Sequence, residues 1–241
     1  MKTIKSIVYT SLYFLLLSST AFAVPYLQLD ASNSTYNDDT ESIVSNSDIF
    51  TLYALVNDST LNLNTDTKTF YISIALPTNV ENNNNDFGSF SVGSKTYYYS
   101  DLKYGTPSKL PKHDIFPTYY VERSFTFSNL TGSNESKDRA TSYNSEDTPG
   151  GLTTTTNVNG SLAYAAFDID ISNLNPKYQL HFDLYTYSSN GKITKAPFSH
   201  DAETGIRTNP PPDNPVPEPS TIMLLGFGLL GLSMIGRKKI V

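Results

Sequence analysis

The sequence predicts an all-β fold for residues 24–205, a single antiparallel β-sandwich of the jelly-roll or immunoglobulin-like type. Three observations support this prediction. Apolar and polar residues alternate along several short stretches, turns rich in Asn, Gly, Ser and Thr separate these stretches, and none of them shows the period of an amphipathic helix. About 180 residues are enough for one well-filled domain. The chain has no cysteine, so the core must hold the fold together without disulfides.

Five stretches carry the alternation most clearly. In each, the apolar residues are two apart and therefore share one face of a strand. These residues are Phe50, Leu52, Ala54 and Val56; Phe70, Ile72, Ile74 and Leu76; Phe125 and Phe127; Ala163, Ala165, Phe167, Ile169 and Ile171; and Leu180, Phe182 and Leu184. The residues between them are mostly polar, which predicts sheets with one buried and one solvated face. Between the strands, we expect the Asn82–Asn85 run to be a flexible turn and the polar segment 131–156 to be a mobile loop.

Residues 1–23 have the composition of a secretory signal peptide. Lys2 and Lys5 precede a mostly apolar run over residues 7–17, and small residues occupy the two positions that a signal peptidase requires before its cut. This pattern predicts cleavage between Ala23 and Val24 and export through the Sec pathway. A retained membrane helix is the alternative, but the apolar run is short for that role.

The other end of the sequence has two successive parts. Residues 206–215 form a proline-rich linker, for which we expect an extended, stiff conformation. A segment at 216–241 follows, with the motif at 217–219, a predicted membrane helix at 221–236 and a basic end at 237–239. The uncharged stretch at 222–235 would reach only about 21 Å as a helix, short of the roughly 30 Å hydrocarbon core.

This arrangement resembles the PEP-CTERM sorting domain. The matching segments are Val216–Thr221, Ile222–Gly226, Gly231–Leu232 and Arg237–Lys239. The resemblance implies an exosortase as a partner, in Gram-negative bacteria that make extracellular polysaccharide, with Pro217, Glu218 and Pro219 as the recognition motif. It also implies a transient stay at the inner membrane through the C-terminal helix, followed by delivery to the cell surface or the extracellular matrix. An ordinary anchor that stays in place is the alternative.

The region between the two ends carries a second resemblance, to the choice-of-anchor N proteins. The segments that carry it are Tyr26–Asp30, Phe50–Leu55, His113–Tyr120 and Ala196–Ala202. This resemblance implies a surface or matrix protein whose domain spans most of residues 24–202. It implies no established catalytic activity, so it assigns no functional residues.

The charge balance restricts the partners of the mature chain. Processing at both predicted sites would remove five of the 17 basic residues, leaving 12 against 22 or 23 acidic residues. A net charge this negative argues against nucleic acid and anionic membrane surfaces as partners. It suits a soluble exported domain, and it suits association with acidic polymers through bridging cations.

Histidines are the first candidates for chemistry. His113 and His200 each precede an aspartate, and Ser199 beside His200 raises acyl transfer as an alternative, although the chain has no Gly-x-Ser-x-Gly elbow. His181 would complete a set of three around zinc, but no metal-binding spacing is present. We therefore expect no catalytic residue and no metal ligand, and we interpret these histidines as loop residues in local hydrogen bonds.

Acidic and aromatic residues on the polar strand faces are the second candidates. Asp168 and Asp170 share one such face, and Asp183 lies beside Tyr185 on another. If the two strands were neighbours, the acids could bind Ca²⁺ or act as a glycosidase pair, and the tyrosine could stack on a sugar ring. These four residues are the candidates for a glycan or cation surface, but we favour the ordinary solvated face of a half-buried sheet, because alternation requires polar residues there in any case.

Taken together, these features predict an exported, non-catalytic protein of the cell surface or extracellular matrix, associated with exopolysaccharide or biofilm. A glycan-binding module and a polysaccharide-acting hydrolase are the two alternatives. Of cofactors, only Ca²⁺ is a candidate.

Overall fold

The structure is a computed structural model that describes residues 24–77, 87–108, 110, 115–130, 135–152, 160–187 and 190–205. All of them belong to the first of the chain's two units, Met1–Arg207. The predicted signal peptide, the linker, the sorting segment and the Asn82–Asn85 turn lie outside the described residues. The described part of the chain contains no helix that could span a lipid bilayer.

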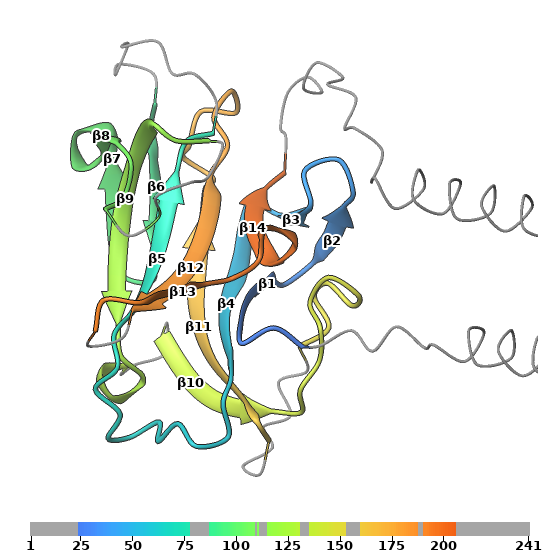
Figure 1. Ribbon diagram of the computed structural model, residues 1–241. Coiled ribbons are helices and arrows are strands. Elements are labelled where there is room, and N and C mark those ends of the chain that lie inside the picture. The colour runs from blue at the N-terminus through green and yellow to red at the C-terminus, as the bar shows by residue number, and fades with distance from the viewer. Residues whose placement is uncertain are drawn as a thin grey trace, which may run out of the picture. The chain divides into compact units, whose positions relative to one another are not determined.

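Two β-sheets build the described domain (Figure 1). The first sheet has the strand order β1–β4–β11–β6–β7, with β10 added along β11, and all its pairings are antiparallel. Its strands are β1 (Leu27–Ala31), β4 (Ile49–Asn57), β6 (Ser89–Val92), β7 (Lys95–Tyr98), β10 (Glu135–Ala140) and β11 (Leu162–Asp170). The fold is thus all-β, as the alternation predicts.

The second sheet has the order β2–β3–β14–β12–β5–β9–β8, with β13 along β12. Its strands are β2 (Ser34–Asn37), β3 (Ser42–Ser45), β5 (Phe70–Ala75), β8 (Lys103–Gly105), β9 (Thr118–Phe125), β12 (His181–Tyr187), β13 (Ile193–Lys195) and β14 (Asp201–Thr204). Three short 3-10 helices complete the description: η2 (Tyr99–Asp101), η3 (Phe127–Asn129) and η4 (Phe198–His200).

One pairing corrects the prediction of a purely antiparallel sandwich. β14 runs parallel to β3, with Ala202 opposite Ile43. These strands come from opposite ends of the described chain, so no hairpin forces them into antiparallel order. The second sheet is therefore mixed.

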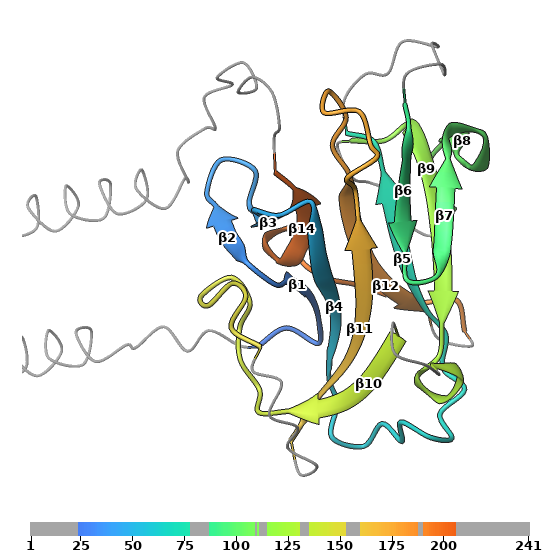
Figure 2. The same cartoon turned by 180° about the vertical axis from the view of Figure 1, so that it is seen from behind.

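The core fills the space between the two sheets, which face each other with β12 toward the viewer in Figure 1 and β11 toward the viewer in Figure 2. Rings from the two sheets meet there: Phe50 of β4 and Phe182 of β12 have centroids 6.2 Å apart, and Phe125 of β9 and Phe167 of β11 are 5.1 Å apart. All of the apolar residues in the five alternating stretches belong to this core. That part of the prediction is confirmed.

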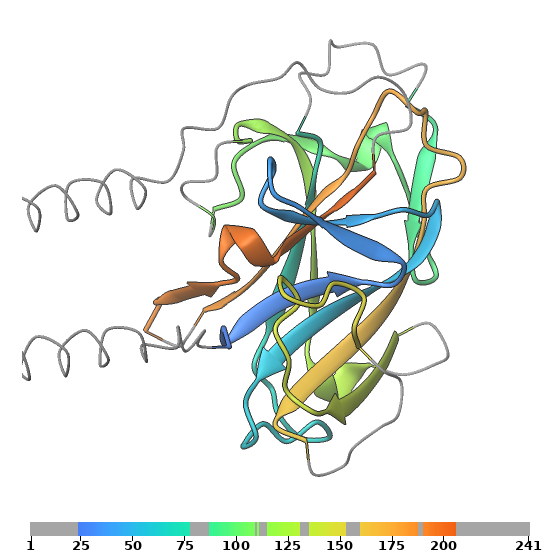
Figure 3. The same ribbon diagram turned by 90° about the vertical axis from the view of Figure 1, so that its right-hand side faces the viewer.

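A smaller apolar cluster covers the outer face of the first sheet. Its buried members are Tyr53, Leu55, Ala140, Leu152, Leu162 and Tyr164. The segment 141–152 lies over β1 and β4 here (Figure 3). The expectation of a mobile loop across 131–156 is therefore wrong for its described part: residues 135–140 are strand β10, and residues 141–152 are packed because the sheet beneath offers them apolar side chains and buried hydrogen-bond partners.

Candidate functional site

The four residues of the predicted glycan or cation surface lie in different sheets. Asp168 and Asp170 belong to β11 of the first sheet, whereas Asp183 and Tyr185 belong to β12 of the second. Asp168 is exposed, and Asp170 Oδ1 accepts a hydrogen bond from the Ser172 amide at 2.8 Å. The structure does not bring these pairs together, because their strands face each other across the core instead of lying side by side.

The expectation that Asp183 and Tyr185 lie on a solvated face is also wrong. Asp183 is 3% exposed and Tyr185 is 0% exposed. The Tyr185 hydroxyl donates to Glu122, and its ring stacks on Tyr71 with centroids 5.2 Å apart. Alternation shows which face a side chain is on, but it does not show whether other parts of the chain cover that face.

Three side chains that commonly bind metals meet on this covered face. His181 and Asp183 come from β12, and Asp201 comes from the start of β14. His181 Nε2 lies 3.7 Å from Asp183 Oδ1 and 3.8 Å from Asp201 Oδ2. One ligand atom from each residue lies within 4.8 Å of the others. The three residues are between 2% and 5% exposed, so the cluster belongs to the interior.

Strand pairing explains how the cluster forms. Phe182 and Ala202 lie opposite each other and both point into the core, so their neighbours along each strand point to the outer face. Continuing this antiparallel register places Asp201 beside Asp183 and leaves His181 next to both. The sequence signal was the His-x-Asp pair followed by a later aspartate. Only the pairing of β12 with β14 shows that the three residues meet.

Electrostatics set the protonation of the cluster. Burial lowers the pKa of His181, but the contacts with Asp183 and Asp201 outweigh burial and raise that pKa to about 10. The imidazole therefore carries a proton at neutral pH when no other cation is present. Glu203, opposite His181 in the register, is also buried and accepts from Thr40 Oγ1 at 2.6 Å.

Ser73 of β5 lies on the other side of Asp183. The two residues are opposite each other in the β5–β12 pairing, and the neighbours of Ser73 along its strand point into the core. Ser73 is 0% exposed, and its Oγ has no hydrogen-bond partner among the described residues. A buried hydroxyl without a partner costs about 1–3 kcal/mol.

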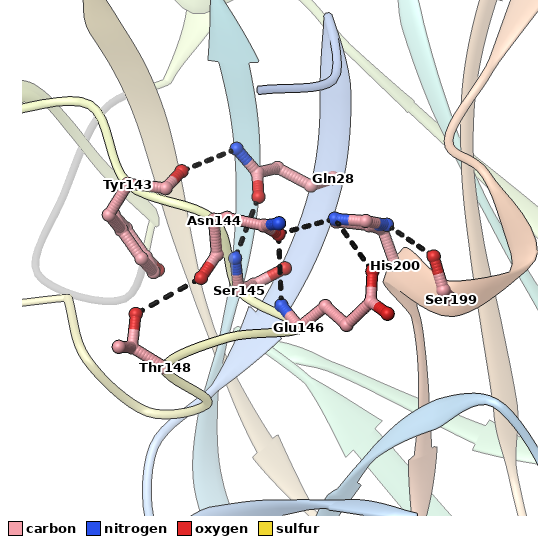
Figure 4. Close-up of polar contacts among 8 residues, drawn as sticks. All are labelled: Gln28, Tyr143, Asn144, Ser145, Glu146, Thr148, Ser199 and His200. Carbon is pink, nitrogen blue, oxygen red and sulfur yellow. Dashed lines mark hydrogen bonds and ion pairs between the residues drawn. The ribbon is translucent and has the colours of Figure 1, made fainter. Parts of the chain in front are cut away.

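A second polar cluster surrounds His200 (Figure 4). His200 Nε2 lies 2.6 Å from Asn144 Oδ1, and His200 Nδ1 lies 2.8 Å from Ser199 Oγ. An amide oxygen can only accept, so Nε2 carries the proton and Nδ1 accepts from the serine hydroxyl. Burial lowers the pKa of His200, whereas Glu146, Asp201 and Asp147 raise it; the net shift is downward, which keeps the ring neutral.

This second cluster attaches η4 to the segment 141–152. Gln28 of β1 adds to the attachment, since its amide donates to the Tyr143 carbonyl at 3.0 Å and accepts from the Ser145 amide at 2.9 Å (Figure 4). Ser199, His200 and Asn144 form a hydrogen-bonded chain of the kind used in nucleophilic catalysis. Two open depressions on the described surface lie elsewhere, lined by residues 35–39 with Val44, and by residues 59–64 with Asp138 and Arg139. His113 lies outside the described residues.

Comparison with known proteins adds one specific finding. The family profile described as "PEP-CTERM protein-sorting motif" matches residues 215–239. This motif suggests an exported surface protein, processed by an exosortase during sorting toward the cell surface in Gram-negative bacteria. The match confirms the first resemblance inferred from the sequence, and no comparison supports the choice-of-anchor N resemblance.

A search of solved structures gives a weak likeness. The collagen binding subdomain of the Enterococcus faecalis surface protein ACE aligns with 76% of this chain and 97% of its own, at 8% identity and a TM-score of 0.24. A score this low transfers neither fold nor ligand to the present chain. No curated protein matches the chain.

Proposed function

We propose that this chain is a non-catalytic protein of the cell surface or extracellular matrix, exported through the Sec pathway and released from the inner membrane by an exosortase. The sorting motif at 215–239 carries this proposal. The apolar and basic residues after Pro217, Glu218 and Pro219 would hold the chain at the membrane until it is cut. Residues 24–205 would then be the exported domain. Its jelly-roll or immunoglobulin-like subtype stays a prediction.

The charge of the exported domain supports a role beside exopolysaccharide or biofilm matrix. After processing, acidic residues would outnumber basic ones by about two to one. Such a domain stays soluble outside the cell and can associate with acidic polymers through bridging divalent cations. The arrangement of the predicted acids supports a non-catalytic role over the hydrolase alternative. A glycosidase needs two carboxylates facing one cleft, and Asp168 and Asp183 belong to different sheets.

A triple alanine variant of Pro217, Glu218 and Pro219 tests the sorting step. We expect the variant to accumulate in the inner membrane, while the unaltered chain reaches the surface or the medium. The matched control replaces Pro210, Pro211 and Pro212 of the linker by alanine and should sort normally. Equal surface delivery of the motif variant and the control would contradict the proposal.

Glycan binding is the second candidate function, and one exposed ring favours it. Tyr104 of β8 is 64% exposed, and its ring packs against Tyr119 with centroids 5.1 Å apart. A tyrosine that is positioned by a neighbouring ring and exposed to solvent can stack on a sugar ring. Binding of the protein to a glycan array should be lost in Tyr104→Ala and kept in Ile49→Ala, which removes an equally exposed apolar side chain (63%). Equal binding by the two variants would exclude this surface.

A further inference from the structure

We propose that His181, Asp183 and Asp201 bind one divalent transition-metal ion of the zinc type, which links β12 to β14. This inference does not depend on the sorting function proposed above. It rests on the geometry of three side chains, on their charge and burial, and on the unsatisfied hydroxyl of Ser73.

The separations fit ligands of a common ion. The His181 Nε2 distances to Asp183 Oδ1 and Asp201 Oδ2 are 3.7 Å and 3.8 Å, longer than a direct N–H···O hydrogen bond. Zinc binds imidazole nitrogen and carboxylate oxygen at about 2.0–2.2 Å, so two ligands of one tetrahedral ion lie about 3.3–3.6 Å apart. The two histidine distances are within a few tenths of an ångström of these values, and all three ligand atoms lie within 4.8 Å of one another.

Charge and burial favour a divalent ion over a proton. The two aspartates are 2% and 3% exposed, so their negative charges are almost fully removed from water. A divalent ion bound by the neutral imidazole would balance both carboxylate charges. Because the three ligands come from strands held in register, the site is formed by the fold and does not require a loop to close.

Ser73 provides the independent observation. Its Oγ is fully buried, it faces Asp183 across the β5–β12 pairing, and it has no hydrogen-bond partner among the described residues. Three protein ligands leave a fourth position on a tetrahedral ion, which is commonly filled by water. A water held there would provide Ser73 with a partner.

The donor set selects the class of metal. Imidazole nitrogen suits zinc and its neighbours, whereas Ca²⁺ prefers six to eight oxygen ligands and Mg²⁺ prefers oxygen and water. One nitrogen and two carboxylates therefore favour Zn²⁺ over the Ca²⁺ that the sequence alone suggests. The expected effect is structural, because the residues are buried and the ion would join two strands of one sheet.

Calorimetric titration of the full chain tests the site. The protein is purified in detergent without a polyhistidine tag, stripped with a chelator and titrated with ZnCl₂, with CaCl₂ and MgCl₂ as separate arms. We expect one Zn²⁺ per chain and a thermal midpoint raised by about 5 °C or more at saturating Zn²⁺. Millimolar Ca²⁺ or Mg²⁺ should not reproduce the shift. Cobalt substitution should give the visible absorption of a tetrahedral site.

Matched variants locate the bound ion. Asp183→Asn and Asp201→Asn keep the side-chain shape but remove a ligand charge, and each should weaken Zn²⁺ binding at least tenfold. Asp168→Asn removes an exposed carboxylate and should bind as the unaltered chain does. The metal-free thermal midpoint of each variant shows whether it folds; we expect the two ligand variants to fold, since each removes a buried charge.

Two outcomes would overturn the proposal. The first is no saturable Zn²⁺ binding by the unaltered chain at 100-fold molar excess. The second is equal Zn²⁺ affinity in Asp183→Asn, Asp201→Asn and the unaltered chain, which would place the ion elsewhere. The first outcome needs no variant, so the test holds even if both variants fail to fold.

Discussion

The hydroxyl of Tyr143 donates a hydrogen bond to Asp30 Oδ2 at 2.6 Å, joining residues 113 positions apart in the chain. The other carboxylate oxygen of Asp30 accepts from the amides of Ala31 at 2.8 Å and Gly150 at 2.7 Å. One buried carboxylate on β1 therefore holds both ends of the segment 141–152. These hydrogen bonds attach the segment 141–152, which has the composition of a loop, to the sheet.

Tyr143→Phe should destabilise the fold by about 1–3 kcal/mol, because the buried Asp30 carboxylate would lose the hydroxyl that donates to its Oδ2. Urea unfolding followed by circular dichroism measures the change. Tyr98→Phe is the control, since this ring is 57% exposed and its hydroxyl can bond to water; we expect a change within about 0.5 kcal/mol. A Tyr143→Phe variant as stable as the control would show that the contact does not hold the segment.

The stability of the domain should depend on the protonation of Asp30. Burial raises the pKa of this carboxyl above its ordinary value of 3.8, and this outweighs the hydrogen bonds from Tyr143, Gly150, Ala31 and Leu152, which lower it. The folded state thus binds the proton more tightly than the unfolded state. The contribution of Asp30 is favourable at low pH and is lost as pH rises from 3.8 through the folded pKa.

Asp30→Asn isolates this contribution, since the amide keeps an acceptor for Ala31 and Gly150 and does not titrate. The free energy of unfolding of the variant, relative to the unaltered chain, should rise as pH is increased from about 3.5 through the folded pKa and then level off. Urea titrations across this range provide the measurement. A difference independent of pH would mean that the carboxyl titrates alike in the folded and unfolded chains.

His200 should give a pH dependence of opposite sign. Burial lowers its pKa below the ordinary value of 6.5, so the unfolded state binds the proton more tightly. Its contribution to stability is present above pH 6.5 and is lost as pH falls through the folded pKa. We expect the protection of amides in residues 141–152, measured as the exchange rate relative to the intrinsic rate at each pH, to decrease as the solution is acidified below 6.5. His200→Gln should remove this decrease, and an unchanged decrease would assign it to other groups.

Gly88 occupies a position that only glycine can fill. Its φ is +75°, and a Cβ built there would lie 2.0 Å from the Asn173 carbonyl oxygen. Gly88→Ala should lower the free energy of unfolding by at least about 3 kcal/mol, because the strain of the left-handed backbone conformation adds to a clash with the backbone. Gly191→Ala is the matched control: its φ is +80° with no atom within 4 Å, so only the strain of about 1–2 kcal/mol applies. Equal losses of unfolding free energy in the two variants would contradict the clash.

Two-residue alternation was enough to predict the core. Residues such as Phe50, Phe167 and Phe182 lie where their periodicity places them, because strand geometry alone decides which side chains share a face. The segment 141–152 could not be predicted in this way. Its order depends on partners more than 100 positions away, and its composition is that of a polar loop.

The candidate site, like the fold, could be predicted from the sequence only in part. Sequence reasoning selected Asp183 as a site residue on a solvated face, and it interpreted His181 as a loop residue in local hydrogen bonds. The burial of that face and the pairing of β14 with both β12 and β3 are long-range features. Asp201 reaches the cluster only because of this pairing. The predicted partner strand, with Asp168 and Asp170, lies in the other sheet.

Mass spectrometry of the protein recovered from the cell surface or medium is the most direct test of the proposed export and sorting. Two strains are compared, one with its exosortase and one in which the exosortase is deleted. In the first strain we expect a mature chain that begins at Val24 and ends near Pro217, Glu218 and Pro219, without the basic residues 237–239. In the second, the chain should keep those residues and stay in the inner membrane. A full-length chain in the cytosol of both strains, with residues 1–23 still attached, would contradict the account.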